Sequence, residues 1–234
     1  MTTKSEVLTW LKQNADERGI AHWKNRKGKF KSYGIGLTRL RTLAKQIGRD
    51  HQLAKSLWKS DVYDAKIVGL LIDDPKKMTC HQVEEQVDSG LDEGMLAHVF
   101  ATCGAPLAKT SFAFELATRW MDSEDEIRRR CGYALLYELS KKNPKGMDDA
   151  FLLDRIGRIE DTIHSEPMWV REAMNTALFG IGKRSKQLNC AAIRAVKAIG
   201  PVDIDYGDDN SCQPLDVLKH LTSDYVKNKL GVLT

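Results

Sequence analysis

Apolar residues recur every three or four positions along most of this chain, and no stretch of strand length alternates regularly between apolar and polar residues. A typical stripe joins Leu40, Leu43 and Ile47 and stops at Gly48. This period places the apolar side chains on one face of a helix. The pattern therefore predicts an all-α protein of about twelve helices with short polar connections.

Signals for helix ends support the same prediction. Capping-box spacing occurs in Thr3–Glu6, Thr79–Gln82 and Ser123–Glu126. Asp50 can cap the start of a further helix, and Gly19 is expected to end the first one. No linker separates two parts of the chain, so we expect a single domain over residues 1–234.

Two of the predicted helices resemble each other. The pairs Ile127–Arg128 and Ala134–Leu135 recur as Val170–Arg171 and Ala177–Leu178, an offset of 43 residues. HEAT and armadillo repeats have periods of about 40–47 residues, although any two amphipathic helices share part of such a pattern. We therefore expect a HEAT-like helical repeat solenoid, whose stacked repeats present a concave, basic face.

The charges of the chain are segregated along the sequence. The net charge is +4, but Lys24–Lys55 holds ten Lys and Arg residues against one acid, Asp50. In contrast, Gln82–Leu96 contains five acids and no base, and Pro201–Pro214 contains four aspartates. This distribution predicts one positive face that attracts a polyanion and acidic regions that repel it.

The sequence gives little support for a membrane protein, a secreted protein or a protein held together by disulfides or metal ions. No apolar run reaches the ~18 residues that cross a bilayer, and the N-terminal segment lacks the apolar core of a signal peptide, so a cytoplasmic location without membrane contact is expected. Five cysteines are scattered without paired spacing: Cys80, Cys103, Cys131, Cys190 and Cys212. We expect reduced cysteines, no metal, no cofactor and a monomer.

Five stretches between Tyr33 and Ile199 carry a family resemblance. They are Leu40–Ser60, Asp74–Gln82, Leu107–Thr110 followed by Trp120, Arg130–Leu136 and Ile181–Asn189. In order and spacing they resemble the DNA alkylation repair (AlkD-like) family. Each stretch would be weak evidence by itself, and their succession makes the resemblance specific.

The resemblance implies a HEAT-like DNA glycosylase for bases made cationic by alkylation at N3 or N7. The positive charge makes the base a good leaving group, so no general acid is needed. Such a protein holds the DNA and places a carboxylate near the sugar, where it stabilises oxocarbenium-like charge in the transition state.

The match fails at the residues that would carry this chemistry. The family's Trp and Asp, one helical turn apart, fall at Ala97 and Ala101, and a second family Trp falls at Thr176. Arg130 is the one catalytic candidate that matches. The sequence therefore leaves open whether the chain is an enzyme.

Two groups of cations are candidates for nucleic-acid binding. The first, called the basic segment (residues 24–31), contains Lys24, Arg26, Lys27, Lys29 and Lys31. Its interleaved aromatics Trp23 and Phe30, with Tyr33 beyond it, favour phosphate contact and base stacking. The alternative is a solubilising loop whose aromatics pack underneath.

The second group comes from the repeated helices and contains Arg128, Arg130, Arg171, Lys183 and Arg184. Arginine forks suit phosphate, and the family register nominates Arg130 for a DNA contact. The alternative is that the arginines at 128–130 pair with Asp122, Glu124 and Glu126 on a solvated face. Lys183 and Arg184 are expected just after a helix C-terminus, where they complement the dipole and can reach phosphate.

These observations support two functions. The chain is either a glycosylase acting on alkylated double-stranded DNA or a non-catalytic HEAT-like module that recognises structurally distorted DNA. Ala97 and Ala101 favour the second, and the family resemblance favours the first. A solenoid that docks proteins is a third option, against which the basic segment argues.

Overall fold

The computed structural model describes residues 2–102, 104–142, 144–207 and 212–231. These residues form fourteen α-helices and two short 3-10 helices, and no strand. Their one β feature is an isolated bridge between Lys31 and Val62. The all-α prediction is confirmed, with two more helices than expected.

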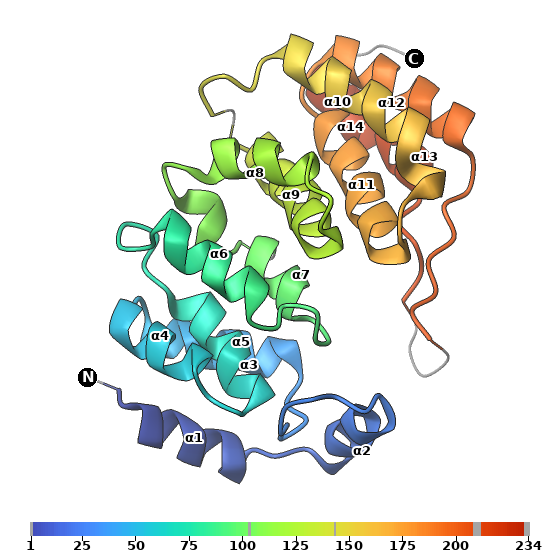
Figure 1. The fold of residues 1–234 in the computed structure, drawn as a ribbon. Helices are drawn as coiled ribbons and strands as arrows, with labels where there is room; N and C mark the ends of the chain where they lie inside the picture. Colours follow the sequence, from blue (N-terminus) through green and yellow to red (C-terminus); the bar gives the residue numbers. More distant parts are fainter. Residues whose placement is uncertain (1, 103, 143, 208–211, 232–234) are drawn as a thin grey trace. The chain divides into compact units, whose positions relative to one another are not determined.

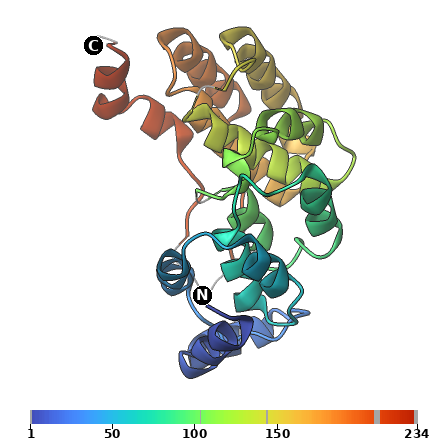
Figure 2. The same ribbon diagram turned by 90° about the vertical axis from the view of Figure 1, so that its left-hand side faces the viewer.

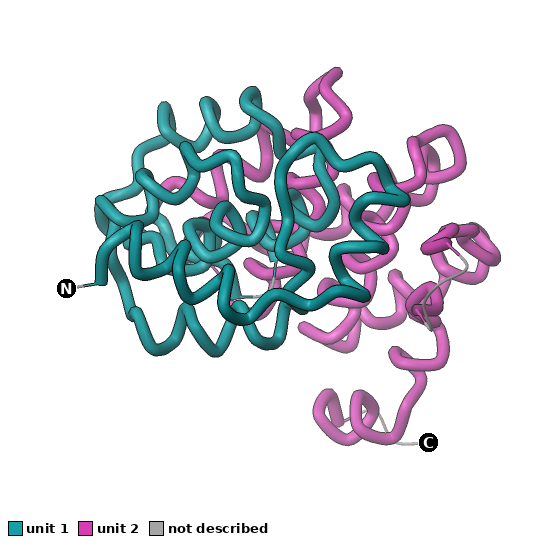
Figure 3. Tube along the Cα trace, turned by 90° about the horizontal axis from the view of Figure 1, so that it is seen from below, with its two compact units in different colours: residues 1–111 teal, residues 112–234 magenta. Residues whose placement is uncertain are grey.

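The chain divides into two compact units, residues 1–111 and 112–234 (Figure 3). Each unit is described by itself, and the single domain over residues 1–234 stays a prediction. Unit 1 contains α1 (Lys4–Gln13), α2 (Glu17–Asn25), α3 (Leu37–Ile47), α4 (His51–Trp58), α5 (Tyr63–Ile72), α6 (Cys80–Asp88), α7 (Leu96–Ala101) and η1 (Leu107–Lys109).

Helix α5 is the core of unit 1. It is buried from Tyr63 to Leu70 and packs against α1, α3, α4 and α7. Gly69 allows α4 to come close, because a Cβ there would lie 2.9 Å from the carbonyl oxygen of Ala54. A helix buried on all sides is expected to be apolar all round, and α5 is apolar except at Asp64 and Lys66.

Most of the predicted helix starts are confirmed. Thr3 accepts a hydrogen bond from the Glu6 amide, and the Glu6 carboxylate accepts one from the Thr3 amide, which completes the capping box of α1. Asp50 caps α4 through the Leu53 amide.

Two capping boxes differ from the prediction. Thr79 caps α6 through the Gln82 amide, but the Gln82 side chain donates to Asp73 instead of completing the box. The predicted box at Ser123 is wrong. Asp125 is the N-cap of α9, because it lies directly before the first helical turn and its carboxylate accepts from the Arg128 amide.

The first helix ends earlier than predicted, and Gly19 does not terminate it. Helix α1 ends at Gln13, and Asp16 caps a second helix, α2, by accepting from the Gly19 amide. A Cβ on Gly19 would lie 2.0 Å from the carbonyl oxygen of Gly34. The glycine is thus required where α2 meets the following segment, and its presence there does not mark a helix end.

Unit 2 contains the longer helices. They are α8 (Ala113–Met121), α9 (Glu126–Ser140), α10 (Asp149–Thr162), η2 (Ile163–Ser165), α11 (Met168–Ile181), α12 (Lys186–Ile199), α13 (Val217–Leu221) and α14 (Asp224–Leu230). Helices α9, α11 and α13 pack in succession as one layer, and α10 packs on α12 in the other (Figure 1). Figure 2 draws α13 and α14 in red at the edge of this unit.

Helices α9 and α11 run side by side in the same direction. Near their starts the guanidinium of Arg130 lies over the Trp169 ring, and beyond their ends Arg184 donates to the carbonyl of Ser140. A Cβ on Gly180 would lie 2.8 Å from the Tyr137 ring, so the glycine lets the helices approach. These facing positions are 39 to 44 residues apart in sequence, which agrees with the predicted repeat.

A buried carboxylate attaches the segment after the basic segment to α5. Asp64 is 1% exposed. It accepts hydrogen bonds from the Ser32 hydroxyl at 3.0 Å, the Tyr33 amide at 2.7 Å and the Ile35 amide at 3.0 Å. These bonds satisfy both carboxylate oxygens and fix residues 32–35 against the core.

We predict that Asp64→Asn destabilises the protein by about 2–4 kcal/mol, because an amide NH2 must then face backbone donors in a buried site. Urea unfolding measures the loss, and hydrogen exchange should become faster at the Tyr33 and Ile35 amides. The exposed Asp61→Asn is the control and should be nearly neutral. Unchanged exchange at both amides would contradict the anchoring role.

Candidate nucleic-acid interface

The basic segment curls around one tryptophan. The indole N–H of Trp23 donates to the carbonyl of Phe30 at 2.7 Å, and its ring stacks on Tyr63 with centroids 4.1 Å apart. A Cβ on Gly28 would lie 2.2 Å from the Trp23 ring, so only glycine fits this turn. Burial raises the pKa of Tyr63 to about 12, and its hydroxyl accepts from the Met95 amide. Trp23 therefore has a structural role, because its contacts hold the basic segment against Tyr63.

A buried lysine lies beneath the same segment. The ammonium of Lys66 donates to the carbonyl of Trp58 at 2.6 Å and lies 4.5 Å from the ring centroids of both Phe30 and Trp58. Burial lowers the pKa of Lys66. Phe30 thus packs inward, and the alternative of aromatics packing underneath describes Trp23 and Phe30 better than base stacking does.

Lys29 is held by acids of its own unit. Its ammonium lies 2.7 Å from Asp92 and 3.2 Å from Glu93, and its amide donates to Glu93. The hydrogen bond to Asp92, followed by that to Glu93, raises the pKa of Lys29. Asp92 and Glu93 belong to the acidic stretch Gln82–Leu96, which was expected to repel a polyanion. Here they neutralise Lys29, one of the candidate lysines for DNA binding.

Three other lysines of the basic segment remain available to a ligand. Lys24, in the last turn of α2, Lys27 and Lys31 are exposed, and none of them lies within ion-pair distance of a carboxylate in the part of the chain that is described. Lys27 has φ +52, a left-handed conformation that costs a non-glycine residue about 1–2 kcal/mol. Strain of this kind is typical of functional turns. Arg26 caps the end of α2 beside them.

In unit 2 most arginines near the start of α9 have acidic partners. Arg129 lies 2.9 Å from Glu166 and also donates to the carbonyls of Ser123 and Glu124. Arg128 lies 3.7 Å from Asp125. Arg129 and Arg128 therefore lie beside acids, but the partners that the structure shows are Glu166 and Asp125 and not the carboxylates of the predicted alternative.

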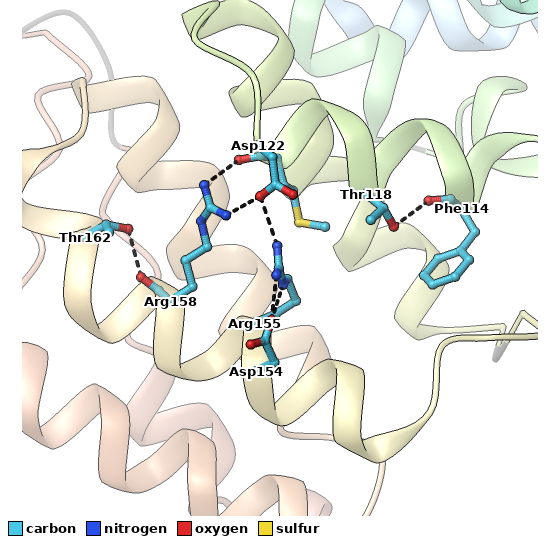
Figure 4. Close-up of polar contacts among 8 residues, drawn as sticks. Phe114, Thr118, Asp122, Asp154, Arg155, Arg158 and Thr162 are labelled. Atoms are coloured by element: carbon cyan, nitrogen blue, oxygen red, sulfur yellow. Dashed lines mark hydrogen bonds and ion pairs between the residues drawn. The ribbon is translucent and has the colours of Figure 1, made fainter.

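Arginines of α10, in the other layer of unit 2, are also paired with acids. Arg155 and Arg158 of α10 converge on Asp122, the C-cap of α8, and Arg155 also pairs with Asp154 (Figure 4). Asp122 lies at the negative end of the α8 dipole. The two guanidinium groups therefore offset both the carboxylate charge of Asp122 and the negative end of the dipole. These arginines join α8 to α10.

Arg130 and Arg171 are less accessible than predicted. Arg130 is 7% exposed and its guanidinium lies 4.9 Å from the centroid of Trp169. The Nε atom of Arg171 is buried without a hydrogen-bond partner among the described residues. Phosphate contact by Arg130 stays a prediction, and its position suits it to holding Trp169.

Lys183 and Arg184 lie where the sequence predicted, just beyond the end of α11 at its C-cap Gly182. Arg184 donates to the carbonyl of Ser140 at the end of α9, 3.1 Å away. The ammonium of Lys183 lies 3.7 Å from the centroid of the Phe179 ring. Both cations therefore complement helix C-termini.

The two positions at which the resemblance places the family's Trp and Asp are buried. Ala97 and Ala101 lie one turn apart on α7, and their exposed fractions are 1% and 0%. Each buried carboxylate of the described residues has another role: Asp64 binds backbone amides, Asp73 binds His51 and Gln82, and Glu138 pairs with Lys141.

The family follows from comparison with known sequences. Residues 7–204 match the family described as DNA alkylation repair enzyme. The chain belongs to this family. Two relatives in sequence are uncharacterized proteins. One, of Listeria innocua, is 26% identical over 197 residues, and the other, of Listeria monocytogenes, is 23% identical over 197 residues. Each match covers 81% of this chain and 81% of the relative.

A solved structure shares the fold of this DNA alkylation repair family member. That structure is of a protein from "a new family of proteins related to the HEAT-like repeat DNA glycosylases with affinity for branched DNA structures". Its TM-score is 0.81 at 23% identity, over 98% of this chain and 97% of that chain. The predicted HEAT-like repeat fold is confirmed, and the concave, basic face stays a prediction.

Other features bear on the expected classes. Among the described residues no helix is long and apolar enough to span a membrane, and no three His, Cys, Asp or Glu side chains gather as a metal site. Cys80, Cys131, Cys190 and Cys212 are free thiols, and Cys103 lies outside the described residues.

Reasoning from the sequence missed the residues that hold the basic segment in place. Asp64, Lys66 and Tyr63 all belong to α5, and no motif marks them. A signal was nevertheless present, because two charged residues interrupt an otherwise apolar run. Buried charges need partners: Asp64 finds its partners in residues 32–35, and Lys66 finds its partners in the carbonyl of Trp58 and the ring of Phe30.

We predict that Ala101→Asp destabilises the protein by about 3–5 kcal/mol at neutral pH, since it places an unpaired charge in the core. Burial would raise the pKa of the new carboxyl, so the loss should be smaller at acidic pH, where both folded and unfolded forms are protonated. Denaturant unfolding measures the change. Ala150→Asp, exposed in the first turn of α10, is the matched control. Equal stability of the two variants would mean that Ala101 faces solvent.

Proposed function

We propose that this chain binds DNA through phosphate contacts of the basic segment and does not itself break the glycosidic bond. Membership of the DNA alkylation repair enzyme family supports DNA as the ligand. The structural relative described as having affinity for branched DNA structures supports the same class of ligand.

The observation that carries this proposal is the set of Lys24, Lys27 and Lys31. Their ammonium groups are exposed on a segment fixed from below by Trp23 and Asp64. An ordered backbone reduces the conformational entropy that the segment loses when a phosphate binds, and the mutual repulsion of the lysines is relieved by an anion. Phosphate contacts of this kind carry no base information, so sequence preference should be weak.

The proposed absence of base excision is based on the residues of α7. A glycosylase of this family type needs a carboxylate near the sugar, and the corresponding position is a buried alanine, Ala101. Neighbouring acids are committed elsewhere, since Asp92 and Glu93 hold Lys29. Without a preorganised carboxylate the rate falls by about 10²–10³.

We predict that binding to double-stranded DNA weakens by about 100- to 1000-fold between 50 and 200 mM salt, as for ~4–6 neutralised phosphates. The triple variant Lys24→Ala, Lys27→Ala, Lys31→Ala should bind more weakly and reduce the slope of log affinity against log salt by about 2–3. Fluorescence anisotropy titrations at several salt concentrations measure both quantities.

The matched control removes the same charge elsewhere in unit 1. Lys12, Lys76 and Lys77 are exposed lysines outside the basic segment, and their triple alanine variant should keep the wild-type slope. If both triple variants lose the same affinity, net charge decides binding and the basic segment is not the site. If the wild-type affinity does not change with salt, the phosphate-binding proposal fails.

We predict that incubation with DNA containing 7-methylguanine or 3-methyladenine releases no free base above the uncatalysed background. Chromatography of the supernatant measures the release, and an active alkyl-base glycosylase on the same DNA is the positive control. Release by this chain would establish the glycosylase alternative and show that a carboxylate other than one at position 101 serves the reaction.

A further inference from the structure

The C-terminal ends of α9 and α11 repeat one small pattern. An aromatic residue is followed four positions later by a lysine, as Tyr137 and Lys141 in α9 and as Phe179 and Lys183 in α11. The two copies are 42 residues apart, one residue fewer than the 43-residue offset of the repeated helices. We call these four residues the aromatic–lysine cluster.

The four side chains lie together in the structure. The Lys141 ammonium is 3.9 Å from the Tyr137 ring centroid, and the Lys183 ammonium is 3.7 Å from that of Phe179 and 5.9 Å from that of Tyr137. The two rings are nearly parallel, with an interplanar angle of 22° and centroids 6.3 Å apart. His220 of α13 extends the cluster, 5.4 Å from Phe179.

Positive charge accumulates around these rings. Lys229 of α14 donates to the carbonyl of Lys183 at 3.2 Å, which brings a third ammonium group to the cluster. Burial, then the charges of Lys229 and Lys141, lowers the pKa of Lys183. The acid that pairs with this group is Glu138, 2.9 Å from Lys141. Among the described residues Lys183 and Lys229 have no carboxylate within ion-pair distance, so the three ammonium groups repel each other and an anion would relieve that repulsion.

A structural role explains part of this arrangement. Lysines at helix C-termini complement the dipoles of α9 and α11. That role requires neither the aromatic partner in both repeats nor the third lysine. In the described part of the chain the Lys183 ammonium meets ring faces and no carboxylate.

We infer that the aromatic–lysine cluster binds DNA where bases are unpaired, as at a branch or a strand end, with phosphates on the lysines and a base stacked on an aromatic ring. Aromatic side chains beside cations are the common solution for single-stranded nucleic acid, because every base has a stacking face and every nucleotide a phosphate. A paired duplex keeps its bases stacked on each other and offers the cluster only phosphates. This inference rests on the proposed DNA binding and adds a ligand preference to it.

The test compares a fully paired duplex with a branched DNA of the same sequence that carries unpaired adenines at the branch. One unpaired adenine is replaced by 2-aminopurine, whose fluorescence is quenched when it stacks. The wild-type chain should bind the branched DNA more tightly and quench the probe. Phe179→Leu, which removes the ring and keeps apolar volume, should lose about tenfold in affinity for the branched DNA, lose the quenching and keep its duplex affinity.

A second variant and two controls keep the result interpretable. Lys183→Gln leaves the packed ring in place and should also weaken branched-DNA binding more than duplex binding. Lys197→Gln, at the opposite end of α12, and Tyr206→Leu, which packs on Trp169 at the start of α11, make equivalent changes away from the cluster and should change neither.

The outcomes separate this inference from the proposed function. Full branched-DNA affinity and quenching in Phe179→Leu and Lys183→Gln would overturn the inference, as would equal wild-type affinity for both DNAs. In either case the salt dependence of the basic segment would stand. Failure of the wild-type chain to bind any DNA would instead overturn the proposed function.

Discussion

The buried carboxylate of Asp64 is the interaction on which the basic segment depends. It projects from α5, the most buried helix of unit 1, and binds two backbone amides and one hydroxyl from residues 32–35. Lys66 and Tyr63, on the same helix, hold Phe30 and Trp23 from below. A segment rich in positive charge repels itself and would not keep one conformation unaided. Its order therefore comes from three side chains of the core helix, at the cost of burying two charges that must both find partners.

The same constraint sorts the cations of the whole chain into two kinds. Some are consumed by structure: Lys29 binds Asp92 and Glu93, and in unit 2 Arg129 binds Glu166. Others stand on ordered backbone without an acid within ion-pair distance, as Lys27 and Lys183 do among the described residues. A count of positive residues along the sequence cannot make this distinction, because ion-pair partners are far apart in the chain and meet only on folding. The second kind is the one that a phosphate backbone can use.

Sequence reasoning predicted the helical class, the repeat and most helix ends correctly, because periodicity, caps and offsets are local or regular signals. It failed where a residue has a packing role that the sequence does not display. Gly19 looked like a helix end and instead makes room for Gly34. The aromatics of the basic segment looked available, and Trp23 and Phe30 instead pack on Tyr63 and over Lys66. The aromatic–lysine repeat was readable in principle, but its offset is 42 residues, one fewer than the 43 of the repeated helices.

Burial is the structural property shared by Ala97 and Ala101, the positions at which the resemblance places the family's Trp and Asp. At Ala97 and Ala101 the small side chains let α7 pack closely into the core of unit 1, so both positions belong to the hydrophobic interior. Returning a carboxylate there would need room, water and a counter-charge together, which a single substitution cannot supply. The parts that grip a polyanion carry no such dependence, because a surface lysine contributes without altering the core. The proposed separation of DNA binding from base excision follows this division, because Ala97 and Ala101 belong to the core while Lys24, Lys27 and Lys31 lie on the surface.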